Sequence, residues 1–135
     1  MIEINNLTGF SVDKKFFTGV AKKVLKGENR GREKISLAFV NKEEIKKLNK
    51  KFRKKNEATD VLSFELKEKD FLGEIVICPE IVKENATKRK TAAKQEMAKV
   101  FIHGILHLLG YEHEKTNKDA EIMEKKQEKY LSKLS

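Results

Sequence analysis

Residues 60–110, DVLSFELKEKDFLGEIVICPEIVKENATKRKTAAKQEMAKVFIHGILHLLG, decide the fold. Two runs rich in β-forming residues, 60–66 and 71–77, flank the polar segment KEKD, which predicts an antiparallel hairpin. Pro79 then suits the first turn of a short helix. Thr91 is expected to cap a longer helix with an apolar face, which ends at Gly110, a residue suited to a left-handed C-terminal cap. This half of the chain therefore predicts a hairpin covered by helices.

The first sixty residues add two strands and two helices to this prediction. Residues 1–5 alternate in polarity and residues 34–40 are rich in β-formers, so both are expected to be strands. Ser11 is expected to cap a helix that runs to about residue 26, and Asn41 resembles the start of a capping box that opens a basic helix. The apolar residues expected on the buried faces are Phe16, Val20 and Val24 in the first helix and Ile45, Leu48 and Phe52 in the second.

The last predicted element is an amphipathic helix that opens at Asn117. Its apolar residues available for packing are Ile122, Met123, Tyr130, Leu131 and Leu134. The predicted order β-α-β-α-β-β-α-α-α indicates an α+β fold, in which a small mixed sheet of about four strands packs against helices. The chain has 135 residues with no internal repeat and no Ser/Gly linker, so we expect a single domain spanning residues 1–135.

Composition excludes several classes of protein. No apolar run exceeds four residues, far short of the ~20 that a membrane span needs, so no membrane association is expected. The N-terminal segment lacks the basic and apolar regions of a secretory signal. One cysteine offers no disulfide framework, which favours a reducing, cytoplasmic location. Solubility together with one exposed basic face favours a monomer.

The charge is concentrated in two stretches. Thirty basic and 21 acidic residues give a net charge of +9, and 26 of the basic residues are lysine. Residues 42–55 hold eight basic and two acidic side chains, and residues 83–99 hold six and two. Such a concentration suits a polyanion, with nucleic acid as the first candidate. A lysine-rich solvated surface is the alternative that charge alone leaves open.

All three histidines of the chain lie within eleven residues, at His103, His107 and His113. The first two are four residues apart on the predicted helix, which places their Cβ atoms about 6 Å apart on one face. The turn at Gly110 allows His113 to return toward them. Three imidazoles predict one Zn²⁺ ion whose fourth position is left for water, as in a catalytic site. Cys78 could close the site as a fourth ligand, but its apolar strand favours a buried hydrophobic role.

The spacing H-x-x-x-H-x-x-G-x-x-H is also that of the metzincin proteases, and the expected metal site is metzincin-like. In those enzymes a Glu follows the first histidine and acts as general base. This chain has Gly104 at that position, so the peptide chemistry is disfavoured while the metal site persists.

Two segments resemble the YbeY family of endoribonucleases. The first is HGILHLLGYEH, residues 103–113, and the second is LNKKFRKKNEATDVLSFE, residues 48–65. The chain departs from the family pattern at Ala58 and Glu65, where Pro is frequent, and at Glu112, where Asp is commoner. The resemblance implies a single-strand-specific, metal-dependent endoribonuclease that acts in 16S ribosomal RNA 3′-end maturation and in ribosome quality control. It also implies ribosomal RNA, and the ribosome or its assembly factors, as partners.

The same resemblance assigns roles to individual residues. His103, His107 and His113 would hold zinc, and His103 and Arg53 would be the catalytic residues. A guanidinium such as that of Arg53 can hold a phosphate or stabilise charge that develops during cleavage. Thr59, Asp60 and Ser63 also match the family motif. The basic residues expected to bind the RNA backbone are Lys50, Lys51, Lys54, Lys55, Lys88, Arg89 and Lys90.

Several questions stay open at the level of the sequence. The nucleophile is either a metal-activated water or an RNA 2′-hydroxyl. A non-catalytic RNA- or ribosome-binding factor with a structural zinc is one alternative function. Another zinc hydrolase, such as a peptidase, is a second alternative, disfavoured by Gly104 and by the basic charge.

Overall fold

A computed structural model describes residues 2–111 and 116–134, and within them the elements follow the predicted order. The strands are β1 (Ile2–Asn6), β2 (Lys34–Phe39), β3 (Val61–Glu68) and β4 (Phe71–Ile77). The helices are α1 (Lys14–Gly27), α2 (Lys42–Arg53), α3 (Pro79–Arg89), α4 (Ala93–Leu108) and α5 (Asn117–Ser132). The α+β class and the four-stranded sheet are therefore confirmed.

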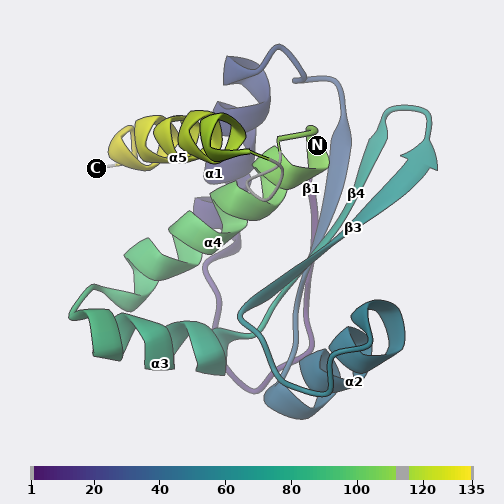
Figure 1. Cartoon of the computed structure of the whole chain (residues 1–135), viewed down its shortest axis with the longest axis vertical. Helices are drawn as coiled ribbons and strands as arrows, with labels where there is room; N and C mark the ends of the chain where they lie inside the picture. The colour runs from purple at the N-terminus through teal and green to yellow at the C-terminus, as the bar shows by residue number, and fades with distance from the viewer. Residues whose placement is uncertain (1, 112–115, 135) are drawn as a thin grey trace.

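The sheet is mixed, with the strand order β1-β2-β4-β3 (Figure 1). β1 and β4 each pair with β2 in parallel, whereas β3 and β4 form the predicted antiparallel hairpin. The hairpin turn is shorter than expected, because β3 continues to Glu68 and only Lys69 and Asp70 connect the strands. Asp70 has a φ of 62°, a left-handed conformation that aspartate tolerates in tight turns. β3 consequently lies at one edge of the sheet.

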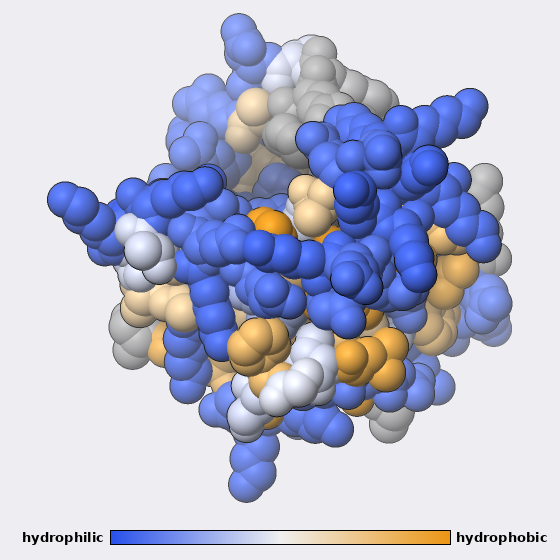
Figure 2. All heavy atoms as spheres, turned by 90° about the horizontal axis from the view of Figure 1, so that it is seen from below, coloured by the Kyte–Doolittle hydropathy of each residue, from blue (hydrophilic) through white to orange (hydrophobic). Residues whose placement is uncertain are grey.

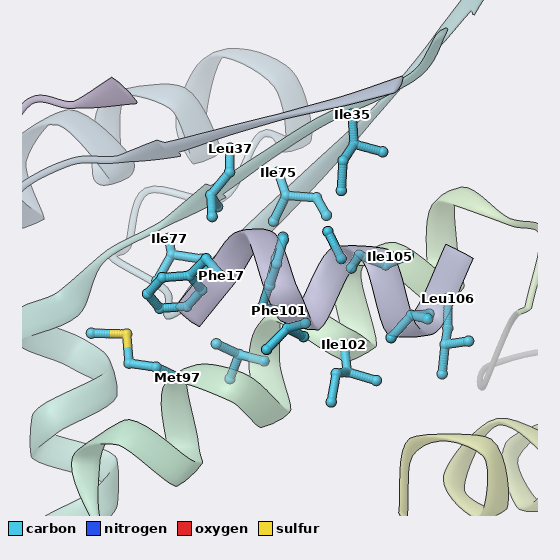
Figure 3. Packing of buried hydrophobic residues seen from close by; sticks show 14 of the residues in the cluster. Phe17, Ile35, Leu37, Ile75, Ile77, Met97, Phe101, Ile102, Ile105 and Leu106 are labelled. Atoms are coloured by element: carbon cyan, nitrogen blue, oxygen red, sulfur yellow. The ribbon is translucent and has the colours of Figure 1, made fainter. Parts of the chain in front are cut away.

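The two faces of the sheet are covered by different helices. Alternate residues such as Leu37 and Ile75 point toward α1 and α4, where they meet Phe17 and Phe101 (Figure 3). The opposite face carries a smaller cluster, in which Ile45 of α2 packs with its apolar neighbours Ala38, Leu62 and Val76. α5 packs on α4 rather than on the sheet (Figure 1). α2 and α4 therefore lie on opposite faces.

Two of the predicted helix caps differ from the structure. Asp13, not Ser11, caps α1 and accepts a hydrogen bond from the backbone N–H of Phe16 at 3.1 Å. Thr91 does not cap α4, because its hydroxyl donates to the buried carboxylate of Glu96 at 3.2 Å. α5 begins at Asn117, as predicted, and the side chain of Thr116 caps it. Ser11 lies two residues before the observed cap of α1, and Thr91 lies one residue before Ala92, the N-cap of α4, which makes no side-chain capping bond.

The cap of α2 is as predicted. The side chain of Asn41 accepts a hydrogen bond from the backbone N–H of Glu44 at 2.9 Å, as the N-terminal half of a capping box requires.

The predicted core is correct except at three aromatic or aliphatic positions. Phe17, rather than its neighbour Phe16, is the phenylalanine of α1 in the centre of the core, edge-to-face with Phe39 and Phe101 at 5.1 and 5.6 Å between centroids. Phe16 is only partly buried against this cluster. Phe52 and Ile122, both expected to pack inward, are exposed. Cys78 is fully buried among apolar residues, in agreement with the hydrophobic role expected for it.

Candidate functional site

The first two predicted metal ligands lie on one face of α4, beside its contact with β3. His103 is half-buried and His107 is exposed. Gly104, between them, lies so close to the sheet that a Cβ atom there would stand 3.1 Å from the Oγ of Ser63 and from a methyl carbon of Ile75. The helix that carries both histidines therefore packs closely against the strand that carries Ser63.

A hydrogen bond to α5 orients the ring of His103. Its Nδ1 lies 3.0 Å from the amide oxygen Oε1 of Gln127. An amide oxygen accepts, so this bond requires the tautomer that has its proton on Nδ1, and the neutral ring then has its lone pair on Nε2. Histidines that bind a metal usually donate their other ring N–H to a neighbouring acceptor in this way. With this hydrogen bond in place, Nε2 of His103 has a lone pair that can bind a metal cation.

Gly110 ends the helix in the manner expected from the sequence. It has a φ of 102°, its N–H donates to the carbonyl of His107, and the N–H of Tyr111 donates to the carbonyl of Leu106, both at 3.1 Å. This pair of bonds is a Schellman motif, which turns the chain sharply after α4. The turn directs the backbone into the segment that carries the third predicted ligand.

His113 lies outside the described residues, as does Glu112. Within residues 2–111 and 116–134, no group of three or more histidine, cysteine, aspartate or glutamate side chains is arranged to hold a metal ion. The metzincin-like three-histidine site thus stays a prediction. Cys78 is not brought to His103 by any described contact, and burial raises the pKa of its thiol, which disfavours the thiolate that a metal requires.

The buried carboxylate of Glu28 binds residues that precede and residues that follow the segment 112–115. Glu28, just after α1, accepts hydrogen bonds from the hydroxyls of Tyr111 and Tyr130. Its Oε2 also accepts from the Nζ of Lys126 at 3.1 Å. Tyr111 directly precedes the segment 112–115, while Lys126 and Tyr130 belong to the helix that follows it. Glu28 therefore holds together the turn after α4, the helix α5 and the end of α1.

The electrostatics of this cluster favour an ionised carboxylate and protonated donors. Burial by itself raises the pKa of Glu28, but the bonds from Tyr111, Tyr130 and Lys126 outweigh it and hold the pKa below its ordinary value of 4.5. Burial and the bond to Glu28 raise the pKa of Tyr130. The bond to Glu28 also raises the pKa of Lys126. Each shift preserves the charge state that the hydrogen bonds need.

We expect Glu28→Gln to lower the free energy of unfolding at pH 7 by about 1–3 kcal/mol, because buried donors lose a charged acceptor. A carboxyl group whose folded-state pKa is depressed stabilises the fold above its unfolded pKa and loses this contribution as the pH falls through the folded-state value. The difference between the wild type and the variant should therefore be full above pH 4.5 and shrink below it. Urea unfolding at pH 7, 5 and 3.5 measures this difference. A difference independent of pH would contradict the role assigned to the Glu28 carboxylate.

The predicted RNA-contacting residues lie at the ends of two basic helices. Lys50, Lys51, Arg53, Lys54, Lys55, Lys88 and Lys90 are all exposed. Lys54 and Lys90 end α2 and α3 in the same left-handed conformation, with φ 57° at each. An ion pair between Lys42 and Glu84 joins the two helices. Viewed from the side on which α2 and α3 lie, the surface is mostly hydrophilic with small hydrophobic spots (Figure 2).

Arg89 differs from the other predicted contacts. Its guanidinium pairs with the carboxylate of Glu96 at 3.0 Å, and the Glu96 side chain is only 5% exposed. Breaking an ion pair with one buried partner leaves an uncompensated buried charge and strongly destabilises the fold. Arg89 therefore also holds α3 against α4.

Arg53 and the histidines come from opposite faces of the sheet. Arg53 ends α2, and residues 54–60 lead from there to β3, the strand that meets α4 at Gly104. The backbone carbonyl of Asp60 accepts from the N–H of Cys78 at 2.9 Å, and the Thr59 hydroxyl bonds to the Asp60 carboxylate at 3.3 Å. The motif residues Thr59, Asp60 and Ser63 thus lie along the path between Arg53 and α4.

Sequence reasoning missed Gln127 and Glu28. The sequence contains one indication of Gln127. It lies four residues after Met123 and three before Tyr130, which are both buried, so a polar side chain interrupts an apolar stripe of the helix. Glu28 gave no such signal, because it follows a helix at a position where charged residues are ordinary.

Comparisons with known proteins agree with the motifs. The family model described as Endoribonuclease YbeY matches residues 3–135. A protein named Endoribonuclease YbeY from Thermotoga maritima is 45% identical over 100 residues, which cover 74% of this chain and 67% of that protein. Its namesake from Bdellovibrio bacteriovorus is 46% identical over 99 residues, covering 73% and 65%. The alignments therefore span about two thirds of these relatives.

The fold has a counterpart among solved structures. The solution structure of TM1509 from Thermotoga maritima superposes with a TM-score of 0.74 at 39% sequence identity, and the match covers 99% of this chain and 89% of that one. The likeness therefore extends over the whole α+β fold, including α2, β3 and α4. With the family model matched from the first strand to the last helix, this chain belongs to the YbeY endoribonuclease family.

Proposed function

We propose that this protein is a single-strand-specific, metal-dependent endoribonuclease that acts in 16S ribosomal RNA 3′-end maturation and in ribosome quality control. The observation that carries the metal dependence is the pair of histidines on α4, one of which has its ring proton held by Gln127. Family membership supports the cleavage of RNA. We further propose that it works in the cytoplasm as a monomer, with the ribosome or its assembly factors as partners.

The donor set fits a zinc ion. Neutral imidazole is a common zinc ligand, and the bond from Nδ1 of His103 to Gln127 leaves that ring with its lone pair on Nε2. His103, His107 and His113 would hold the ion. When bound, zinc would supply a Lewis acid for a phosphodiester oxygen and would lower the pKa of a coordinated water.

The remaining residues bind and orient the RNA. The exposed lysines of α2 and α3 attract the phosphate backbone. Arg53 is proposed to stabilise the negative charge that accumulates on the phosphate during cleavage. Gln127 holds the ring proton and the orientation of His103, and Glu28 with Tyr111 positions the chain that enters the segment of His113.

A peptidase is a poorer candidate. Gly104 is the position where the metzincin general base would stand, and a Cβ atom there already approaches Ser63 and Ile75 at 3.1–3.2 Å. A glutamate side chain at this position would have to displace the edge strand or α4. The chain therefore offers neither the carboxylate nor the space for it.

The test is cleavage of an RNA that carries a hairpin and a single-stranded tail. We expect cuts in the tail alone, loss of cutting in a chelator, and its return when zinc is added. Arg53→Ala should lower the cleavage rate by about 10²–10³-fold, the usual effect of removing a group that stabilises transition-state charge. Arg53→Lys, which keeps the charge but not the bidentate geometry, should retain more of the activity.

Identical purification of all variants separates this enzyme from traces of a host ribonuclease. Equal cutting by wild type, variants and chelated protein would indicate contamination. No cutting by any of them, with RNA binding retained, would instead favour a non-catalytic RNA-binding factor and overturn the proposed activity.

A further inference from the structure

The end of α2 carries an aromatic ring that the fold leaves uncovered. Phe52 is 57% exposed, although the apolar pattern of α2 predicts it to be buried. Its ring meets the ring of Phe64 edge-to-face, at 5.2 Å between centroids and 65° between planes. Phe64 belongs to β3, the edge strand, so Phe52 lies where the sheet ends. Phe52 is exposed because, in the part of the chain that the structure describes, no further strand lies beyond β3 to cover its ring.

The surroundings of Phe52 hold the ring in place. Asn49, one turn earlier, is buried and donates from its amide nitrogen to the carbonyl of Glu57 at 2.9 Å. This bond ties the last turn of α2 to the loop that follows it. Together with the contact to Phe64, it fixes the backbone on both sides of Phe52. An exposed ring on a fixed backbone loses little conformational entropy when a ligand stacks on it.

The charge around the ring is positive. The Nζ of Lys51 lies 5.2 Å from the ring centroid, and Lys50, Arg53 and Lys54 are neighbours in sequence on the same helix end. Lys50 also lines a hollow of about 300 Å³ with Lys46, Lys47, Glu43 and Asn56, so that three of its four charged side chains are basic. Single-stranded nucleic acids are bound by this combination, in which bases stack on aromatic rings while cations follow the phosphates. A purely apolar protein partner would leave these ammonium groups unpaired.

We propose that Phe52 is a stacking platform for a base of single-stranded RNA, with the lysines beside it on the flanking phosphates. This inference deepens the proposed function, on which it rests, because it gives a structural reason for a preference for unpaired RNA. A base in a duplex has no free face to offer, whereas an unpaired base can stack on the phenyl ring.

The chain contains no tryptophan, so Phe52→Trp introduces a single indole at the platform. We expect a single-stranded oligouridine to quench the fluorescence of this indole in a saturable way, whereas heparin, a polyanion without bases, should bind without quenching. The measurement is made in a chelator, where no cleavage is expected. Absence of quenching by RNA, or equal quenching by heparin, would overturn the inference.

Affinity gives an independent measure. Phe52→Leu should weaken binding of the oligouridine about tenfold in fluorescence anisotropy, within the range of a lost base–aromatic stack, and leave heparin binding unchanged. Phe10→Leu is the matched control, since Phe10 is 40% exposed and has Lys83 at 4.3 Å over its ring. An equal loss in both variants would assign the effect to the basic surface and overturn the role of Phe52.

The two proposals can fail separately. Quenching at position 52 without any zinc-dependent cleavage by the wild type would support the stacking platform and contradict the proposed nuclease. Cleavage without quenching or loss of affinity would support the nuclease and contradict the platform.

Discussion

His107→Ala is expected to abolish metal-dependent RNA cleavage while leaving the fold intact. Loss of a residue that merely supports a metal ligand typically costs 10–100-fold in affinity or activity, so loss of a ligand itself should cost at least about 100-fold. The fold should tolerate the change because His107 is exposed on α4 and does not belong to the hydrophobic core cluster. We therefore expect a weakened affinity for zinc, measured by competition with a chromophoric chelator, together with an unchanged melting temperature of the metal-free protein.

Lys15→Ala provides the control for this experiment. Lys15 is an exposed residue of α1 outside the proposed site, and its loss should change neither zinc affinity nor cleavage. Should His107→Ala bind zinc as tightly as the wild type, the assignment of this histidine as a ligand would be wrong. A lower melting temperature in the metal-free variant would instead indicate a packing role for the imidazole.

Gly73→Ala is expected to have the largest effect on stability. Gly73 has a φ of 153°, and a Cβ atom there would lie 2.2 Å from the backbone carbonyl oxygen of Phe64. The carbonyl belongs to the partner strand of the hairpin, so relief requires the two strands to separate. The backbone strain alone costs about 1–3 kcal/mol, and the displaced strand adds to it. We expect a loss of more than about 3 kcal/mol in urea unfolding, or failure to accumulate as folded protein.

Gly19→Ala is the matched control, because this glycine-to-alanine substitution is expected to raise the free energy of unfolding. Gly19 lies inside α1, and a Cβ atom there meets nothing within 4 Å. Replacement of a helical glycine by alanine should stabilise the protein by about 0.5–1 kcal/mol. A similar loss of stability in both variants would contradict the close approach of Gly73 to Phe64 as the cause.

The stacking platform and the histidine pair lie on elements that cover opposite faces of the sheet, and β3 connects them. A strand of RNA that runs from Phe52 toward α4 would follow the edge of the sheet. The two proposals together therefore predict that binding and cleavage are separable: Phe52 variants should lose affinity for RNA, whereas His107→Ala should lose cleavage and keep binding. Anisotropy and cleavage assays on the same oligomer distinguish these effects.

The sequence by itself determined the order of the elements and the local devices that begin and end them. The β-forming runs of β3 and β4, the Asn41 cap and the Schellman turn at Gly110 depend on residues within a few positions of one another. The histidine spacing on α4 is local in the same sense. Physical preferences of this range are encoded in short windows, which explains why they were predicted correctly.

Only the tertiary structure decided which of two adjacent apolar residues is buried and which polar residues meet. Phe17 rather than Phe16 enters the core, and Phe52 is exposed, because the extent of the sheet determines where each helix is covered. Glu28 meets Tyr130 across 102 positions of sequence and Tyr111 across 83, and His103 meets Gln127 across 24. No periodicity in a single helix specifies such pairs. They form because the packing of α1, α4 and α5 brings their ends together, and a buried polar group must then find its partner there.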